Sequence, residues 1–190
     1  QMTNEEAVRV VFLDRDGTLI ADREYLHRIE QVDLLPGAVD GLRVLAGMGF
    51  ALVVATNQSG VARGKFTEDD VRKVNEYLRT ILAEHGVHVR AFLYCPHHPE
   101  GSIPEYALIC ECRKPASGMA KQAETFLGEI DYANSWSIGD KPTDIEFGQK
   151  LGMKTALLRS HYWTTPPEPK PDFIVNTLFE AAQKIRTRTK

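Results

Sequence analysis

Short apolar runs alternate with segments of helical periodicity along most of the chain, and this alternation constrains the fold more than any other feature. Parallel strands need a long crossover between them, and a helix is its usual form. The pattern therefore predicts an α/β fold built on a mainly parallel sheet. The expected strands are residues 8–13, 50–55, 89–94, 136–139, 154–158 and 172–175. The expected helices lie between Gly37 and Gly47 and at residues 67–82, 116–126, 143–151 and 178–185.

Length and charge limit the classes of protein to which this chain can belong. With 190 residues, 43% of them hydrophobic and 26% charged, we expect one globular domain over residues 1–190. The net charge of -3 argues against a general nucleic-acid or membrane-surface binder. The sequence has neither a signal-peptide pattern at its start nor an apolar run long enough to cross a bilayer, so we expect a cytoplasmic protein with small-molecule partners.

Polar residues follow three of the predicted strands. Asp14 and Asp16 come after the first strand, residues 56–59 after the second, and Asp140 and Asp144 after the fourth. One such Asp is most often a turn former or a helix cap. Several at one edge of a sheet would repel one another by about 4 kcal/mol per pair at 4 Å, with an effective dielectric near 20. We therefore expect a cation there, and oxygen ligands favour Mg²⁺.

All three cysteines fall between residues 95 and 112, a Pro-containing stretch that we call the cysteine loop and interpret as an insertion. The pairs Cys95/His97 and Cys110/Cys112 suit a tetrahedral structural zinc site, although each pair is one residue closer than the usual C-x₂-C spacing. His98 is an alternative ligand. The competing interpretations are unrelated surface residues or a strained disulfide between the last two cysteines.

Four motifs in order resemble those of the haloacid-dehalogenase-like (HAD) phosphohydrolases, over about residues 8–160. The first is Asp14-Arg15-Asp16-Gly17-Thr18-Leu19, the second Thr56-Asn57, the third Lys114, and the fourth Gly139-Asp140 with Asp144. The resemblance implies a HAD-like Rossmannoid three-layer α/β/α fold. A DxD pair alone would be weak evidence, whereas four motifs in order are strong.

The resemblance also implies roles for these residues. Asp14 would be the nucleophile that forms an aspartyl-phosphate, and Asp16 the general acid and base. Mg²⁺ would be bound by Asp14, the backbone carbonyl of Asp16, and Asp140. Thr56 and Lys114 would contact the transferred phosphoryl group.

Within the same resemblance Asp144 would orient Lys114 or a metal-bound water. Arg113 and Lys141 would anchor a second phosphate, with a solvated turn as the alternative for Lys141. For Arg63 and Lys65 we expect solvation.

The cysteine loop is similar to that of one particular group of phosphatases among the HAD-like proteins. Together with residues 56–66, 95–99 and 113–115 it resembles the heptose 1,7-bisphosphate 7-phosphatases of ADP-heptose synthesis for lipopolysaccharide core. This implies Mg²⁺ and Zn²⁺ as cofactors and a sugar bisphosphate as substrate, with a preference for the β anomer. Zinc held by Cys95, His97, Cys110 and Cys112 would fix the loop that presents Arg113 and Lys114. The implied substrate contacts are Asp22, Arg23, Glu24, Tyr25, Thr56, Asn57, Gln58, Ser59, Arg113, Lys114 and Lys141.

Other functions fit the sequence less well. A histidinol-phosphate phosphatase has a similar core and zinc loop, but that activity is often fused to a dehydratase domain, for which we expect no room in this chain. A polynucleotide 3′-phosphatase is disfavoured by the net charge. A binding module with an inactive core would not need the full catalytic set. We expect a monomer.

Overall fold

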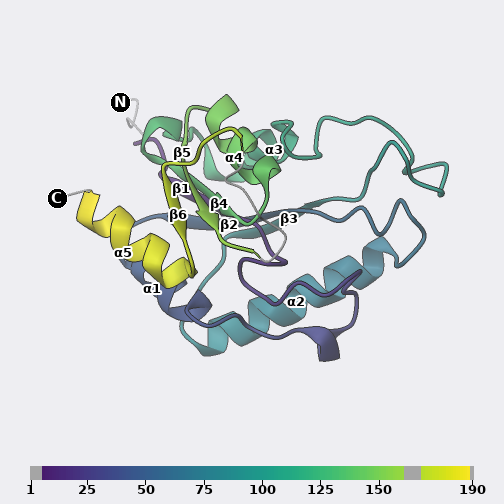
Figure 1. Ribbon diagram of the computed structural model, residues 1–190, viewed down its shortest axis with the longest axis horizontal. Coiled ribbons are helices and arrows are strands. Elements are labelled where there is room, and N and C mark those ends of the chain that lie inside the picture. Colours follow the sequence, from purple (N-terminus) through teal and green to yellow (C-terminus); the bar gives the residue numbers. More distant parts are fainter. Residues whose placement is uncertain (1–5, 161–167, 189–190) are drawn as a thin grey trace, which may run out of the picture.

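The computed structural model describes residues 6–160 and 168–188 and contains a six-stranded parallel sheet. The strand order is β3-β2-β1-β4-β5-β6 (Figure 1). The strands are β1 (Val10–Leu13), β2 (Ala51–Asn57), β3 (Ala91–Cys95), β4 (Trp136–Gly139), β5 (Lys154–Leu158) and β6 (Phe173–Val175). This confirms the predicted parallel α/β class.

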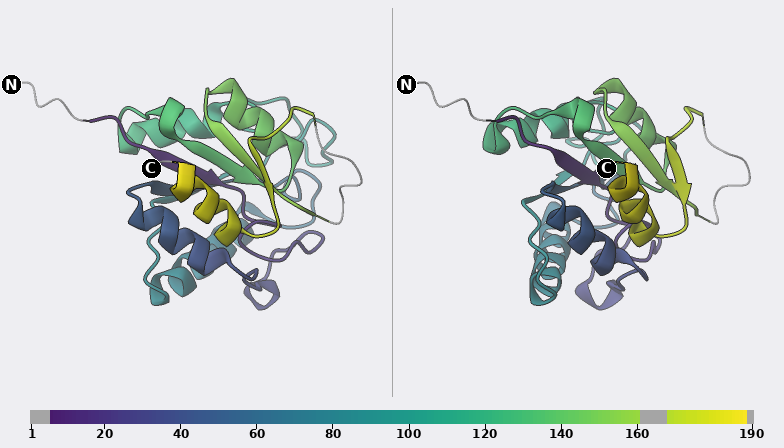
Figure 2. Two further views of the ribbon diagram at one scale, coloured as in Figure 1. Left: turned by 60° about the vertical axis from the view of Figure 1, so that its left-hand side comes forward. Right: turned by 90° about the vertical axis from the view of Figure 1, so that its left-hand side faces the viewer.

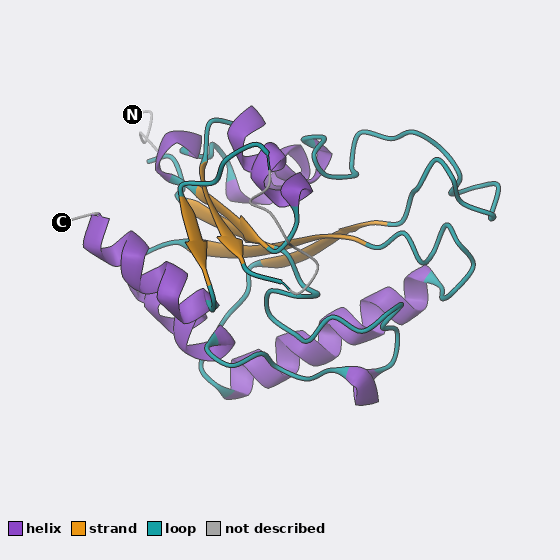
Figure 3. Ribbon diagram, viewed as in Figure 1, coloured by secondary structure: helices purple, strands orange, loops and turns teal. Residues whose placement is uncertain are grey.

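Helices cover both faces of the sheet and make three layers, as Figure 3 shows. The helices are α1 (Ala38–Gly47), α2 (Glu68–Glu84), α3 (Gly118–Leu127), α4 (Pro142–Lys150) and α5 (Leu178–Arg188). Because side chains alternate along a strand, Val11 and Leu13 of β1 pack towards α1, α2 and α5. Val10 and Phe12 pack towards α3 and α4. Figure 2 shows α1 and α5 side by side on the first of these faces.

Most element boundaries agree with the sequence within two residues, and the differences have local causes. Strand β2 continues to Asn57 because residues 53–57 pair with all of β3. Helix α2 begins where predicted, since Thr67 and Asp70 form a reciprocal capping box. Two short 3-10 helices, Ile29–Gln31 and Tyr132–Asn134, were not predicted. The extended connection predicted around Pro166 and Pro167 lies outside the described residues.

The strand order places the carboxyl ends of β1 and β4 next to each other although Leu13 and Gly139 are 126 positions apart in the sequence. Chain connections leave β1 and β4 towards opposite sides of the sheet, and open α/β sheets bind ligands at such a point. The loops that follow β1, β2 and β3 extend from this edge (Figure 1). Among the described residues no helix has the length and apolar character of a membrane span.

Candidate active site

Three buried carboxylates meet where β1 and β4 end. The backbone N–H of Asp14 donates to the carbonyl of Ile138 at 3.0 Å, which ties the end of β1 to β4. Oxygens of Asp14, Asp140 and Asp144 lie within 4.8 Å of one another. Gly17 makes this approach feasible, because its φ is 83° and a Cβ there would lie 2.1 Å from Asp140 Oδ2. The sequence prediction that these strand-end carboxylates lie together is confirmed.

Two lysines lie among the carboxylates. Lys114 is buried, and its Nζ donates to Asp144 Oδ1 at 2.6 Å and lies 3.4 Å from Asp14 Oδ1. Lys141 Nζ lies 3.0 Å from Asp140 Oδ1 and 3.5 Å from Asp14 Oδ2. Asp144 thus contacts Lys114 as expected, and Lys141 is bound to the aspartates instead of being a purely solvated turn residue.

The charges of this cluster shift its pKa values in opposite directions. Burial disfavours the Asp14 carboxylate, but Lys114 and Lys141 outweigh it and hold the pKa of Asp14 well below its usual range. Burial, followed by the negative charge of Asp14, raises the pKa of Asp140 to about 8. Two lysines therefore do not neutralise the three carboxylates. The site has the oxygen donors and the excess negative charge that a divalent cation requires.

The carboxylate of Asp16 is held by a separate set of donors. Arg15 Nε lies 3.1 Å from Asp16 Oδ2, and Gln58 Nε2 donates to the same oxygen at 2.9 Å. Gln58 Nε2 also lies 2.9 Å from the hydroxyl of Thr56. Arg15 is only 1% exposed and donates to Asn75 of α2 at 2.8 Å. Nothing in the sequence indicates this contact for Asn75, because it is one of many polar residues on an amphipathic helix.

Asn57 has a supporting role that the sequence did not indicate. Its side-chain amide donates to the carbonyl of Lys114 at 3.0 Å and accepts from the N–H of Lys114 at 2.9 Å. The Nζ of Lys114 also donates to the carbonyl of Ala55. Because Ala55 and Asn57 belong to β2, this strand fixes Lys114 at both its backbone and its ammonium group.

A cavity of about 460 Å³ opens over these residues. Its lining contains Asp14, Asp16, Asp22, Arg23, Tyr25, Thr56, Asn57, Gln58, Ser59, Arg113, Lys114 and Lys141, all of them expected at the site. Glu24, which was expected with them, is exposed and lies outside this lining. Leu26, Gly60 and Phe66 also line the cavity although the sequence analysis gave them no role. Asp140 borders an adjoining cavity of about 410 Å³.

The cysteine loop brings its four predicted ligands together. Sulfur and imidazole Nδ1 atoms of Cys95, His97, Cys110 and Cys112 all lie within 4.8 Å of one another. Cys110 Sγ is 3.5 Å from each of the other two sulfurs, and His97 Nδ1 is 3.7 Å from Cys95 and 3.3 Å from Cys112. Thiolates bound to one zinc ion at about 2.3 Å lie roughly 3.7 Å apart. Cys95 and Cys112, at 2.7 Å, form the shortest of the three sulfur pairs.

The alternatives to this ligand set are not found. All three cysteines are free, so the disulfide is absent. His98 uses its Nδ1 to accept from the N–H of Glu100 at 3.0 Å, while its Nε2 faces Arg63 at 3.4 Å. The four clustered side chains could hold a metal ion, and His97 is the imidazole placed to do so.

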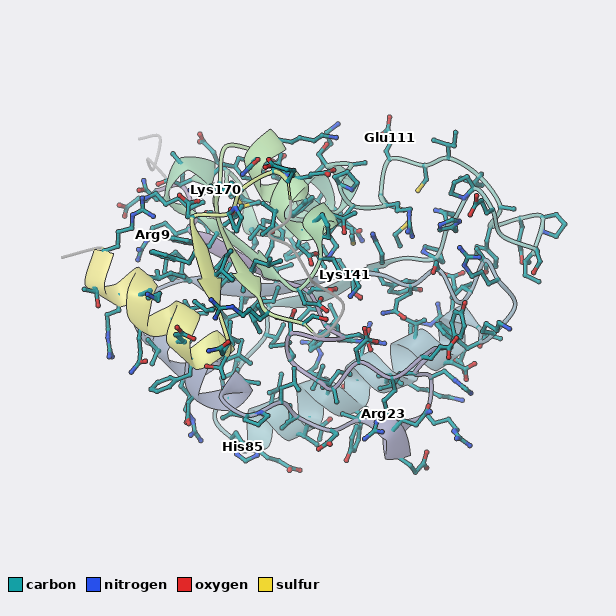
Figure 4. The ribbon with its side chains drawn as sticks, in the orientation of Figure 1. Arg9, Arg23, His85, Glu111, Lys141 and Lys170 are labelled. Carbon is teal, nitrogen blue, oxygen red and sulfur yellow. The ribbon has the colours of Figure 1, made fainter. Side chains whose placement is uncertain are left out.

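The segment after the cluster leads into the cavity. Arg113 directly follows Cys112 and lines the cavity, and its Nη1 is buried with no hydrogen-bond partner among residues 6–160 and 168–188. Figure 4 shows Glu111 pointing outward from the loop and Lys141 near the middle of the view. Arg63 is 34% exposed, and neither it nor Lys65 lines the cavity.

Known proteins with similar sequences identify the family. A sequence model of the HAD-hydrolase-like family matches residues 111–181. The chain is 40% identical over 187 residues to a D-glycero-β-D-manno-heptose-1,7-bisphosphate 7-phosphatase of Escherichia coli K12, covering 97% of both chains. The chain belongs to the heptose-1,7-bisphosphate 7-phosphatase family. A second member, from Yersinia pestis, is also 40% identical over 97% of this chain and 99% of its own.

A solved structure agrees with membership of the heptose-bisphosphatase family. The D,D-heptose 1,7-bisphosphate phosphatase from B. bronchiseptica, complexed with magnesium and phosphate, superposes with a TM-score of 0.78 at 25% identity. The match covers 95% of this chain and 99% of that one. The HAD-like three-layer fold expected from the four motifs is thereby confirmed.

Proposed function

We propose that this protein removes the 7-phosphate of D-glycero-β-D-manno-heptose 1,7-bisphosphate and leaves the 1-phosphate. One observation carries the proposal: a family relative named for this reaction is 40% identical over 97% of the chain. The cavity supports it, because a nucleophile, an acid/base candidate and phosphate-binding cations line the same space. Histidinol phosphate is the alternative substrate and has no comparable support.

The first chemical step starts from Asp14. Lys114 and Lys141 keep its carboxylate ionised, so an oxygen of Asp14 can attack the phosphorus atom. A bond forms between that oxygen and phosphorus, and the bond between phosphorus and the sugar oxygen breaks. Asp16 donates its proton to the leaving oxygen, which departs as an alcohol.

The second step releases phosphate. Asp16, now ionised and held by Arg15 and Gln58, removes a proton from a water molecule. That water attacks the phosphorus of the aspartyl-phosphate, which restores the Asp14 carboxylate. Thr56 and Lys114 contact the phosphoryl oxygens in both steps and stabilise the charge that develops on them.

Mg²⁺ fits the oxygen donors of Asp14, Asp140 and the backbone carbonyl of Asp16, and when bound it would reduce the repulsion between the nucleophile and the phosphate. The negative charge of Asp14 helps to raise the pKa of Asp140, and a cation bound between the two carboxylates would relieve that repulsion, which supports this assignment. Zinc fits Cys95, His97, Cys110 and Cys112, whose three sulfurs and one nitrogen would leave no open position. Its role would be to fix the loop.

A second phosphate needs its own cations. Arg113 has a buried guanidinium nitrogen without a partner among the described residues, and it lines the cavity. Lys141 is the second candidate, since it reaches the cavity from the start of α4. A guanidinium can bind a phosphate through two donors at once, which suits the non-reacting end of a bisphosphate.

The cellular setting follows from this substrate. We propose a cytoplasmic, monomeric enzyme of ADP-heptose synthesis for the lipopolysaccharide core, with a sugar bisphosphate as its partner and neither nucleic acid nor membrane. The net charge of -3 supports the exclusion of nucleic acid. Gel filtration of the purified protein tests the monomer, and a dimer would contradict it.

A comparison of substrates tests the activity. Phosphate release from the β anomer of heptose 1,7-bisphosphate should exceed that from histidinol phosphate by at least about two orders of magnitude in kcat/KM. The α anomer serves as the matched control for anomer preference and should be the poorer substrate. Equal or reversed values for histidinol phosphate would overturn the proposed function.

A further inference from the structure

One wall of the cavity contains backbone strain that the proposed mechanism does not use. Tyr25 lines the cavity and has a φ of 54°, and within residues 6–160 and 168–188 it is the only non-glycine residue with a positive φ. A bulky residue rarely adopts this region, because the backbone is strained there. The surrounding contacts must therefore hold Tyr25 in place.

His27 supplies one of these contacts. Its Nδ1 lies 2.8 Å from the carbonyl oxygen of Tyr25, and because a carbonyl only accepts, Nδ1 carries the proton and donates. The backbone N–H of His27 donates to Gln31 Oε1 at 3.1 Å, and that of Arg28 donates to the same oxygen at 3.0 Å. The turn that presents Tyr25 is thus fixed on both sides of His27.

The His27 ring also joins this turn to the loop after β2. It stacks on Phe66, with ring centroids 5.8 Å apart and an interplanar angle of 12°. Phe66 lines the cavity and lies directly on Gly60, where a Cβ would be 2.1 Å from the ring. A second link is the ammonium group of Lys65, 5.4 Å from the centroid of the Tyr25 ring. Lys65 and Phe66, two neighbouring residues of the loop after β2, therefore support the part of the cavity wall that Tyr25 forms.

The wall differs in character from the reacting end of the cavity. Tyr25, Leu26 and Phe66 contribute aromatic and aliphatic surface, whereas Asp14 and Lys114 are charged. Charged groups hold the transferred phosphoryl group, so the apolar surface is left to contact the carbon skeleton of the substrate. A small phosphate monoester would make little use of it.

We propose that His27 is a positioning residue that holds Tyr25 in its strained conformation, and that it thereby sets the selectivity for a large sugar bisphosphate over a small phosphate monoester. The inference rests on the proposed function. His27 acts through Tyr25 and does not itself line the cavity.

Three variants of His27 separate its two contacts. In His27→Ala, kcat/KM for heptose 1,7-bisphosphate should fall about tenfold, mainly through KM, while kcat/KM for glycerol phosphate stays within about twofold. His27→Asn retains an N–H donor near the position of Nδ1 and should recover most of the loss. His27→Phe retains the stacked ring but no donor, and should behave like His27→Ala. Melting temperatures identify any variant that fails to fold. If His27→Ala fails to fold, the comparison of His27→Asn with His27→Phe tests the inference instead.

A double-mutant cycle links His27 to Tyr25. If His27 acts through Tyr25, the double variant His27→Ala/Tyr25→Ala should lose no more kcat/KM for the bisphosphate than Tyr25→Ala alone. Additive losses, or an equal fall for both substrates in His27→Ala, would overturn the inference and leave the proposed function intact. A wild-type enzyme without preference for the bisphosphate would overturn both.

Discussion

Individual side chains in this site are held by other side chains more than by their own backbone. Lys114 has its backbone fixed by Asn57 and its ammonium group fixed by Asp144. Burial would lower the pKa of Lys114, but the charges of Asp14 and Asp144 raise it above the usual value. The lysine therefore stays charged in a buried position and can stabilise a phosphoryl group.

Replacement of the nucleophile is the most direct test at this scale. Asp14→Asn should reduce kcat to below about 1% of the wild type, because removing a nucleophile removes the covalent route. The fold should be retained, since asparagine fills the same space and the buried Lys114 keeps its hydrogen bond to Asp144. The control is Asp33→Asn, an acid in the same loop whose side chain is 68% exposed. Residual activity above a few percent in Asp14→Asn would point to another nucleophile.

The support of Lys114 by Asn57 gives a second prediction. Asn57→Ala removes two hydrogen bonds to the Lys114 backbone, so the free energy of unfolding should fall by about 1–3 kcal/mol. The value of kcat should fall as well, because Lys114 loses its position. Urea unfolding and steady-state kinetics measure the two effects. Wild-type stability together with wild-type kcat would show that Asn57 does not position the lysine.

At the scale of elements, the cysteine loop is the part of the fold that depends on side-chain chemistry instead of regular structure. Between β3 and α3 it contains neither a helix nor a strand, yet it places Arg113 in the cavity. One contact between this loop and the rest of the molecule is made by Tyr106, whose hydroxyl donates to Glu68 Oε2 of α2 at 2.7 Å. Tyr94 of β3 donates to the other oxygen of the same carboxylate at 2.8 Å.

The proposed zinc site of the loop can be tested by substitution. Cys110→Ala should lower the zinc content of the purified protein from about one equivalent and also lower the melting temperature, because a structural zinc contributes directly to folding. His98→Ala is the matched control and should retain the metal, since His98 lies outside the cluster. Metal analysis gives the result, and full zinc in Cys110→Ala would exclude this ligand set.

The contact between Tyr106 and Glu68 gives a pH-dependent prediction. The hydrogen bond from Tyr106, and more weakly the one from Tyr94, lowers the pKa of Glu68 below its usual 4.5. A carboxylate with a lowered pKa stabilises the folded state above that usual pKa, and the effect is lost as pH falls through the lowered value. Tyr106→Phe should therefore be less stable than the wild type at pH 7, and the difference should shrink below about pH 4.5. Urea unfolding at both pH values measures it, and a constant difference would contradict it.

At the scale of the whole molecule, the site exists only because distant parts of the chain meet. Asp14 and Asp140 follow strands that are neighbours in the sheet but are separated in sequence by β2, β3, three α-helices and two 3-10 helices. Ligands that bind this junction should stabilise the entire fold, because they bind the folded state alone.

This coupling can be measured by thermal unfolding. Mg²⁺ and inorganic phosphate together, each at about 100 times its Kd, should stabilise the wild type by roughly 2.7 kcal/mol per bound ligand and raise its melting temperature. Asp140→Asn removes a proposed metal ligand and should lose most of the shift. An equal shift in wild type and variant would place the binding elsewhere.

Local patterns in the sequence determined the parallel α/β class, the HAD-like motifs and the two groups of candidate metal ligands, because strand periodicity and strand-end residues are local properties. The tertiary structure decided which side chains actually meet. It shows that His97 lies in the cysteine cluster and His98 does not. It also shows that Glu24 lies outside the cavity lining and that Phe66 belongs to it. Supporting residues such as Asn57 act through partners far away in the sequence, and no local pattern encodes such a contact.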